Sequence, residues 1–291
     1  MNKKLLVTIF LLPWIIGFFG YGIYPIIISF YYSLCHYDVL QFPMFIGFSN
    51  YIEIFFNDPY FWKSISNTFI YTFFRVPLNI ILSLILAVLI NQISKGSSLF
   101  RTAYFVPSLV SGVALSVIWM WIFNPQIGLF NIVLTFFGIT GPMWFQDPNW
   151  SKPALIIMSF WSIGGGRMLI FLAALRNISP KLYEAFRLDG GNSIQSFFHI
   201  TLPMISPIIF LWTIIEFIAS LQVFTESFIM TKGGPLDSTL FYNLYLYNKA
   251  FQDFNMGYAS ALAWILLLIT FFITIIQFRL SKKYVHYEGI Q

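Results

Sequence analysis

Charged side chains are scarce in this sequence, so the few that interrupt apolar segments mark where chemistry could take place. Charged residues make up 9% of the 291 residues, and hydrophobic residues make up 58%. Arg167 and Glu216 each lie within an apolar segment, where a charge is costly and usually faces a cavity or a partner. The richest polar interval is 184–207, between two long apolar segments. These two features are the candidate sites.

The polar interval predicts two short helices joined by a sharp turn. Residues 182–188 contain no helix breaker, so a short helix is expected there. The Gly190–Gly191 pair ends it, because glycine accepts the positive φ that a sharp helix-ending turn requires. Asn192 or Ser193 can then cap a second short helix over 194–200.

We call residues 178–203, with these two helices, the elbow. It is longer than an ordinary connection between helices, and long ordered loops tend to be functional. It offers both charged and apolar side chains to a partner. A docking device and a plain interhelical loop are the two interpretations, and the length favours docking.

The elbow also resembles a known motif. Glu184-Ala185, then Gly190, then Ile200-x-Leu202-Pro203 is similar to the signature loop of ABC-importer permeases, although Phe186 stands where that family usually has alanine. In that family the loop forms a coupling helix that sits in a groove of the ATP-hydrolysing subunit. The resemblance therefore implies ATPase-docking residues, namely Glu184, Ala185, Phe186, Asp189 and Gly190.

Three further stretches, within 46–62, 119–131 and 233–261, resemble carbohydrate-uptake permeases related to the larger maltose-transporter permease. The resemblance covers nearly the whole chain. It implies one all-α transmembrane domain over 1–291 with six spans and a type I ABC-importer permease fold. It also implies ATP-driven import of a sugar, an oligosaccharide or a related polyol, with a non-sugar solute as the alternative.

The same resemblance implies partners. These are a second homologous permease, usually non-identical, two ATPase subunits and an extracytoplasmic solute-binding protein. A P-loop needs a Gly-Lys pair to hold phosphates, and the chain contains none. We therefore expect a transport subunit rather than an enzyme, without a cofactor of its own, and with ATP and Mg bound by the partner ATPase.

Composition and apolar segments place the chain in a lipid bilayer. The mean hydropathy is +0.76, far from that of a soluble globular chain. The first apolar segment exceeds the h-region of a signal peptide, which has about 7–15 residues, so we expect it to be retained. The predicted spans cover about 5–34, 65–91, 104–123, 154–175, 204–230 and 257–278.

The distribution of Lys and Arg predicts the orientation. Six spans put both termini on one side. The opposite loops hold four basic residues, Lys63, Lys152, Lys232 and Lys249. The side with the termini and the elbow holds ten, namely Lys3, Lys4, Lys95, Arg101, Arg176, Lys181, Arg187, Arg279, Lys282 and Lys283. The positive-inside rule therefore predicts a multi-pass protein of a bacterial-type inner membrane with cytoplasmic termini and elbow. The basic residues form no patch with interleaved aromatics, so nucleic acid is not an expected partner.

A substrate pathway is predicted from polar residues inside the spans. Glu216 lies about 18 Å along the fifth span and Arg167 about 13 Å from the end of the fourth, at 1.5 Å per residue. The two charges are thus at similar depth. They form either a buried ion pair that fixes helix packing or a polar lining, and Arg75 is given no role. The candidate pathway residues are Thr213, Glu216, Ser220, Ser227, Trp161 and Arg167.

Other classes of function fit the sequence less well. A secondary transporter needs no docking elbow and often shows an internal repeat. A membrane-embedded enzyme needs clustered His, Asp or Glu, whereas the three histidines are isolated. An exporter would not carry external loops that resemble those of importers.

Overall fold

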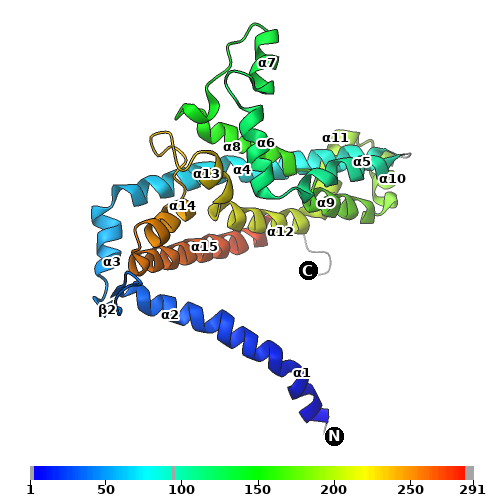
Figure 1. Cartoon of the computed structure of the whole chain (residues 1–291). Helices are drawn as coiled ribbons and strands as arrows, with labels where there is room; N and C mark the ends of the chain where they lie inside the picture. Colours follow the sequence, from blue (N-terminus) through cyan, green and yellow to red (C-terminus); the bar gives the residue numbers. More distant parts are fainter. Residues whose placement is uncertain (1–2, 94–95, 286–291) are drawn as a thin grey trace. The chain divides into compact units, whose positions relative to one another are not determined.

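The computed structural model describes residues 3–93 and 96–285, and it is mostly helical (Figure 1). Two short strands, β1 (Cys35–His36) and β2 (Met44–Phe45), pair antiparallel. The α-helices are α1 (Lys3–Gly17), α2 (Tyr24–Ser33), α3 (Ser49–Ile52), α4 (Pro59–Gln92), α5 (Ser97–Phe105), α6 (Gly112–Ile122), α7 (Leu129–Phe136), α8 (Ser151–Ser159), α9 (Gly166–Asn177), α10 (Pro180–Leu188), α11 (Ser193–Ser196), α12 (Leu202–Leu221), α13 (Thr225–Met230), α14 (Tyr242–Tyr247) and α15 (Met256–Tyr284).

Short turns of 3-10 or π-helix extend or join several of these helices. They are η1 (Phe18–Ile23), η2 (Glu53–Asn57), η3 (Val106–Leu109), η4 (Trp144–Gln146), η5 (Phe160–Ser162), η6 (Phe197–Thr201) and η7 (Asn248–Gln252). The chain forms two compact units, residues 1–62 with 245–269 and residues 63–244 with 270–291. Both candidate sites lie in the second unit.

Among the described residues, four helical segments are long and apolar enough to cross a membrane, and two bent pairs bring the number to six if each pair is one span. The four are Phe10–Ser33, Pro59–Gln92, Ser193–Met230 and Met256–Lys283. The bent pairs are Ser97–Leu109 with Gly112–Ile122, at 97°, and Ser151–Ser162 with Gly166–Asn177, at 52°. The two breaks fall within the third and fourth predicted spans, which the sequence pattern had treated as continuous.

The break in the third span has a local cause. Pro107 lies in η3, where its ring and missing N–H oppose continuation of the helix. Val110 is then extended, with φ −72° and ψ 133°. Ser111 starts α6 as an N-cap, and its Oγ accepts a hydrogen bond from the Ala114 N–H at 3.4 Å. The chain therefore ends one helix and begins another at a new angle.

Glycine allows the break in the fourth span. Gly165 precedes α9 with an extended backbone, φ −70° and ψ −156°. A Cβ on Gly164 would lie 2.4 Å from the carbonyl oxygen of Tyr104 in α5. A side chain at that position would therefore push α5 away. The Gly164–Gly166 triplet thus combines local unwinding of the helix with a close approach to α5.

One apolar core of the second unit joins α4, α9 and α12. Two hydrogen bonds add to the packing: Asn79 Nδ2 donates to Ser159 Oγ at 3.0 Å, and Ser83 Oγ donates to the Ile163 carbonyl at 2.8 Å. Close packing and such bonds hold helices together in lipid, which supplies no hydrophobic drive between them. The buried residues of this core are Val76, Ile80, Leu84, Ala87, Ile90, Met168, Phe171, Leu172, Leu175, Ile178 and Ile205.

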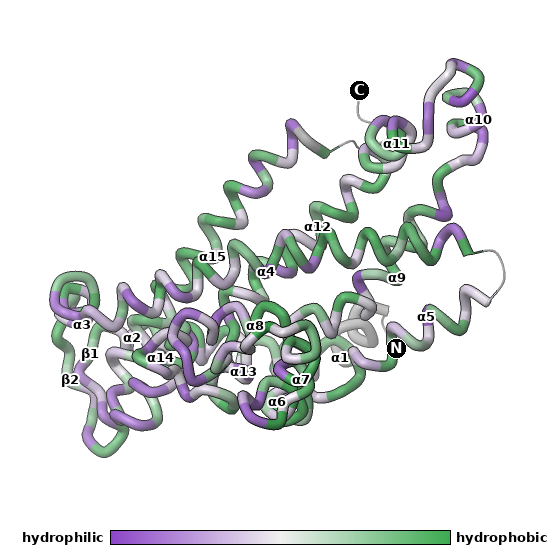
Figure 2. The backbone as a smooth tube through the Cα atoms, turned by 90° about the horizontal axis from the view of Figure 1, so that it is seen from above, coloured by the Kyte–Doolittle hydropathy of each residue, from purple (hydrophilic) through white to green (hydrophobic). Residues whose placement is uncertain are grey.

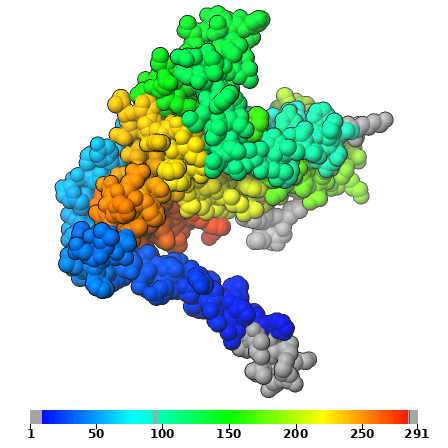
Figure 3. Space-filling model, in the orientation of Figure 1, coloured from blue at the N-terminus to red at the C-terminus, as the bar shows by residue number. Residues whose placement is uncertain are grey.

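A second, aromatic core supports the segment around α7. The Trp144 indole N–H donates to Asn131 Oδ1 at 2.7 Å, and the Asn131 amide donates to the carbonyls of Pro125 and Pro142. Trp119 and Phe123 pack in the same cluster. Figure 3 shows this segment, in green, standing out from the α6 and α8 region of its unit.

The first unit is held by polar contacts at its outer turns. Asp58 precedes α4 and accepts hydrogen bonds from the backbone N–H groups of Tyr60 and Phe61. Its other carboxylate oxygen accepts the hydroxyls of Tyr245 and Tyr258. Burial raises the pKa of Tyr245, and the hydrogen bond to Asp58 raises it further. Asp58 therefore fixes α14 and the start of α15 to the start of α4.

Candidate functional site

The first helix of the elbow, α10, ends in a turn that requires glycine. Gly190 has φ +84°, and its N–H donates to the Arg187 carbonyl at 3.0 Å. The N–H of Gly191 donates to the Phe186 carbonyl at 3.0 Å. This pair of bonds is a Schellman motif, which satisfies two carbonyls at the helix end. The positive φ predicted for the Gly190–Gly191 pair thus lies at Gly190.

The second helix of the elbow starts with a capping box. Asn192 Oδ1 accepts from the Gln195 N–H at 2.9 Å, and Gln195 Oε1 accepts from the Asn192 N–H at 2.9 Å. Asn192, rather than Ser193, is the cap. The α-helical part is shorter than the predicted 194–200 because α11 passes into the π turn η6 and then into α12.

Phe186 joins the two arms of the elbow. Its ring stacks on His199 with centroids 6.1 Å apart and planes at 25°. A Cβ on Gly191 would lie 2.1 Å from Phe186 Cε1. Gly191 therefore leaves room for the Phe186 ring. Position 186 is the one where the family that the elbow resembles usually has alanine. Phe186 is half-buried and packs within the elbow.

The outer surface of the elbow is open to a partner. Glu184, Ala185 and Asp189 are exposed, and Leu188 and Ile194 are 89% and 72% exposed. Figure 2 shows purple, hydrophilic positions at α10, in contrast to the green run along α12. The elbow thus presents two carboxylates and two exposed apolar side chains on a rigid backbone.

The elbow is anchored to the helices of its unit by a residue that the sequence pattern did not single out. Tyr183 OH and Thr201 Oγ1 are 2.9 Å apart, a hydrogen bond between α10 and η6. Both residues line a cavity of about 320 Å³, together with Asn91 and Arg187 among others. Tyr183 carried no signal in sequence because it is one of 16 tyrosines in an aromatic-rich chain.

Deep in the same unit, three charged side chains meet. Arg167 Nη1 lies 2.8 Å from Glu216 Oε1, and Arg75 Nη2 lies 4.0 Å from Glu216 Oε2. The similar depth predicted for Arg167 and Glu216 thus corresponds to a direct contact. Arg75, to which sequence reasoning gave no role, completes this group from α4. We call Arg75, Arg167 and Glu216 the charge cluster.

Aromatic rings cover both arginines. The Arg167 guanidinium lies 6.0 Å from the Trp212 ring centroid, and that of Arg75 lies 5.6 Å from the Tyr71 ring centroid. Such contacts are favourable for a cation. Part of the cluster makes no hydrogen bond among the described residues, namely Arg75 Nε, Arg167 Nε and Glu216 Oε2. The cluster therefore keeps hydrogen-bonding capacity in a buried setting.

The other predicted pathway residues do not all join the cluster. Ser220 lies one turn beyond Glu216, is fully buried, and its Oγ has no hydrogen-bond partner among the described residues. Ser227 Oγ instead donates to the Thr239 carbonyl at 2.5 Å, which fixes a loop. Trp161 is 45% exposed and packs edge-on against Trp119 at 6.0 Å. Only Arg167, Glu216 and, one turn further, Ser220 lie together.

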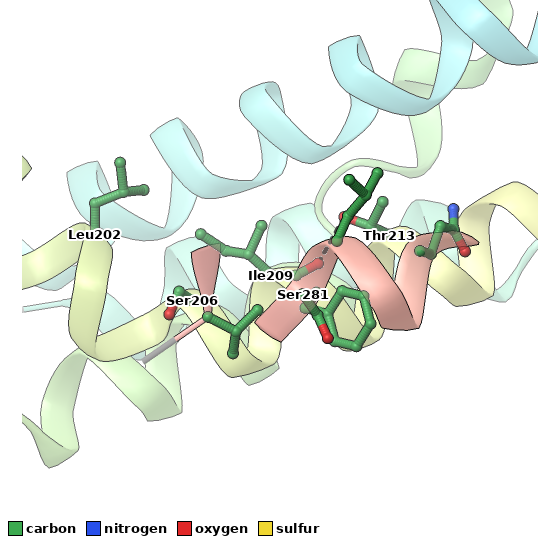
Figure 4. A pocket seen from close by; sticks show the side chains of 9 residues that line it. Leu202, Ser206, Ile209, Thr213 and Ser281 are labelled. Atoms are coloured by element: carbon green, nitrogen blue, oxygen red, sulfur yellow. Dashed lines mark hydrogen bonds between the residues drawn. The ribbon is translucent and has the colours of Figure 1, made fainter. Parts of the chain in front are cut away.

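Thr213 lines a different feature, an apolar groove of about 390 Å³ between α12 and the C-terminal part of α15. Figure 4 shows Ser206, Ile209 and Thr213 on α12, with Ser281 on α15. The Thr213 hydroxyl donates to the Ile209 carbonyl at 2.8 Å, so it is satisfied within its own helix. The candidate pathway residues of the fifth span therefore divide between two environments.

Comparison with known proteins identifies the chain. Residues 46–286 match the family model described as "Binding-protein-dependent transport system inner membrane component". This chain belongs to that family. It is thus a permease component of such a system, a multi-pass protein of the inner membrane.

Individual relatives agree with this assignment over most of the permease. It is 42% identical over 284 residues to the probable ABC transporter permease protein YesP of Bacillus subtilis, covering 96% of this chain and 91% of YesP. It is 37% identical over 245 residues to the lactose transport system permease protein LacF of Rhizobium radiobacter, covering 82% of each.

A solved structure supports the fold. A chain of a bacterial ABC transporter, described as involved in the import of the acidic polysaccharide alginate, superposes with a TM-score of 0.85. The superposition covers 98% of both chains at 24% identity. The predicted all-α ABC-importer permease fold is thereby confirmed.

Proposed function

We propose that this permease is the transmembrane subunit of an ATP-driven importer for a saccharide. Its elbow docks a separate ATPase, and its charge cluster lines the path of the solute. ATP and Mg are bound by that ATPase, and no cofactor belongs to this chain. Named relatives support the substrate class, since one is a lactose system permease and a structural neighbour belongs to an alginate importer.

The geometry of the elbow carries the proposal. A Schellman turn, a capping box and the Phe186–His199 stack fix the elbow without any partner, whereas Glu184, Leu188 and Ile194 remain exposed. A rigid backbone that presents charged and apolar groups loses little conformational entropy on docking. A plain connector would need neither this rigidity nor these exposed side chains.

The charge distribution supports the orientation and the partners. Ten Lys and Arg residues accompany the termini and the elbow, against four in the opposite loops, which favours a cytoplasmic elbow. An ATPase in the cytoplasm can reach it there. The complete importer then comprises a second, non-identical permease, two ATPase subunits and an extracytoplasmic solute-binding protein.

Replacement of Gly190 by valine tests the proposal. A β-branched residue at φ +84° either strains the turn, at about 1–3 kcal/mol, or opens it and displaces α10. We expect Gly190→Val to insert in the membrane normally, to lose copurification of the ATPase and to abolish ATP-driven uptake. The readouts are ATPase recovery with the tagged permease and saccharide uptake into vesicles.

Gly138 offers a matched control. It ends α7 with φ +74° and the same pair of bonds, from Gly138 N to Thr135 O at 2.9 Å and from Ile139 N to Leu134 O at 2.9 Å. A Cβ at either glycine meets nothing within 4 Å. Gly138→Val therefore adds the same strain outside the elbow and should keep ATPase recovery. Normal recovery and uptake with Gly190→Val would refute a docking role.

A further inference from the structure

The charge cluster is not electrically balanced. The side chains of Arg167, Glu216 and Arg75 are 6%, 10% and 16% exposed, so all three are largely buried. Together they carry two positive charges and one negative charge. A charge inside a membrane segment is costly unless a partner neutralises it. The one carboxylate is committed to Arg167 at 2.8 Å, which leaves Arg75 with the incomplete pairing.

Glu226, another acidic residue of the same unit, does not close this gap. Glu226 lies in the first turn of α13 and is only half-buried. In the described part of the chain, no ion pair within 4.0 Å joins it to Arg75 or Arg167. Glu226 thus leaves Arg75 without a second ion-pair partner.

Within the charge cluster and on Trp212, which covers Arg167, donors without a hydrogen-bond partner also outnumber acceptors. The N–H groups that make no hydrogen bond among the described residues include Arg75 Nε, Arg167 Nε and Trp212 Nε1. Glu216 Oε2 is the one carboxylate oxygen of the cluster that makes no hydrogen bond among the described residues. Guanidinium and indole N–H groups can only donate. A solute that fits this lining must therefore bring acceptors.

A carboxylate meets both requirements. It is an acceptor-only group when ionised, it carries the missing negative charge, and it matches the planar fork of arginine in a bidentate pair. Sugar hydroxyls also accept hydrogen bonds, but they leave the excess charge in place. The cluster therefore distinguishes an acidic saccharide from a neutral one by charge rather than by shape.

We infer that the solute is an acidic saccharide whose carboxylate binds Arg75, while Arg167 and Glu216 remain paired. This inference rests on the proposed import of a saccharide. Arg75 is assigned the contact because it is the most exposed member and its ion-pair distance is the longest, 4.0 Å. Glu216 is a positioning residue, since its two carboxylate oxygens face the two guanidinium groups, at 2.8 Å from Arg167 and 4.0 Å from Arg75.

The test uses the complete importer in vesicles and two disaccharides that differ at one group, one with a glucose unit and the other with glucuronate. We expect ATP-driven uptake of the acidic member to exceed that of the neutral one. Arg75→Gln should lower the acidic-to-neutral uptake ratio about tenfold or more, the effect of losing hydrogen bonds to a charged group. Arg279→Gln, at an exposed position near the end of α15, should leave the ratio unchanged. Because every variant meets the same binding protein, its own preference cancels in this comparison.

Arg75→Lys keeps the charge but loses the fork, so it should reduce the ratio less than Arg75→Gln. If Arg75→Gln fails to assemble, the uptake ratio of Arg75→Lys alone tests the contact between Arg75 and the carboxylate. An unchanged ratio in both Arg75 variants would overturn the inference and leave saccharide import standing. If the complete importer, supplied with ATP, takes up neither these disaccharides nor larger saccharides, the proposed function itself is contradicted.

Discussion

The elbow and the charge cluster lie in one structural unit but depend on opposite features of the chain. The elbow is formed by neighbouring residues, and its shape comes from the backbone, with a Schellman turn at Gly190 and a capping box at Asn192. The charge cluster is formed by side chains from α4, α9 and α12, far apart in sequence. The elbow exposes its polar groups, whereas the cluster buries them.

This difference determines which substitutions each region tolerates. In the elbow, a change of an exposed side chain alters the contact with a partner but leaves the fold intact. In the cluster, removal of one side chain leaves another charge buried without its counter-ion. Backbone substitutions should therefore be most damaging in the elbow, and charge substitutions in the cluster.

The largest expected effect on stability is in the cluster. Glu216→Gln leaves two buried arginines without a carboxylate and should destabilise the permease by about 3–5 kcal/mol, as for a broken buried ion pair. Arg167→Met should cost less, because Arg75 can move from 4.0 Å to pair with Glu216. Thermal unfolding of the purified permease in detergent measures both.

The double variant Arg167→Met with Glu216→Gln sharpens the comparison. It leaves Arg75 as the single charge of the cluster, so it should be more stable than Glu216→Gln alone. Equal stability of the wild type and Glu216→Gln would show that the ion pairs contribute nothing to the fold.

A smaller effect is expected inside the elbow. A Cβ at Gly191 would lie 2.1 Å from the Phe186 ring, so Gly191→Ala must displace that ring from His199. Overpacking of this kind costs about 1–3 kcal/mol, and we expect a several-fold loss of ATPase recovery. Phe186→Ala in the same chain should restore part of it by removing the clash. If Gly191→Ala behaves as wild type, the Phe186 ring does not hold the two arms of the elbow.

Local sequence patterns predicted the elbow closely but the cluster only in part. Gly190 and Asn192 act on residues within four positions, so their turn and cap could be inferred from spacing. Arg167 and Glu216 could be brought to similar depth by counting along two helices. Arg75 could not, because its role depends on the relative rotation of α4, which no local pattern encodes.

The breaks in the third and fourth spans show the same limit. The glycines at 164–166 permit close approach, and Gly164 lies against Tyr104. The 97° bend after Pro107 was not predicted, because a proline in a membrane helix usually kinks it without ending it. Hydropathy alone gave each region as one uninterrupted apolar run.

Cross-linking from the exposed tip of α10 tests most directly whether the elbow docks an ATPase. Leu188 is 89% exposed, and Phe137, which follows α7, is 71% exposed. Each residue is changed to cysteine in a Cys35→Ser background. A photoactivatable cross-linker is then attached to the new cysteine in the assembled importer. A docking elbow predicts a strong ATPase adduct from position 188 and none from position 137. No ATPase adduct at 188, or an equal one at 137, would contradict it.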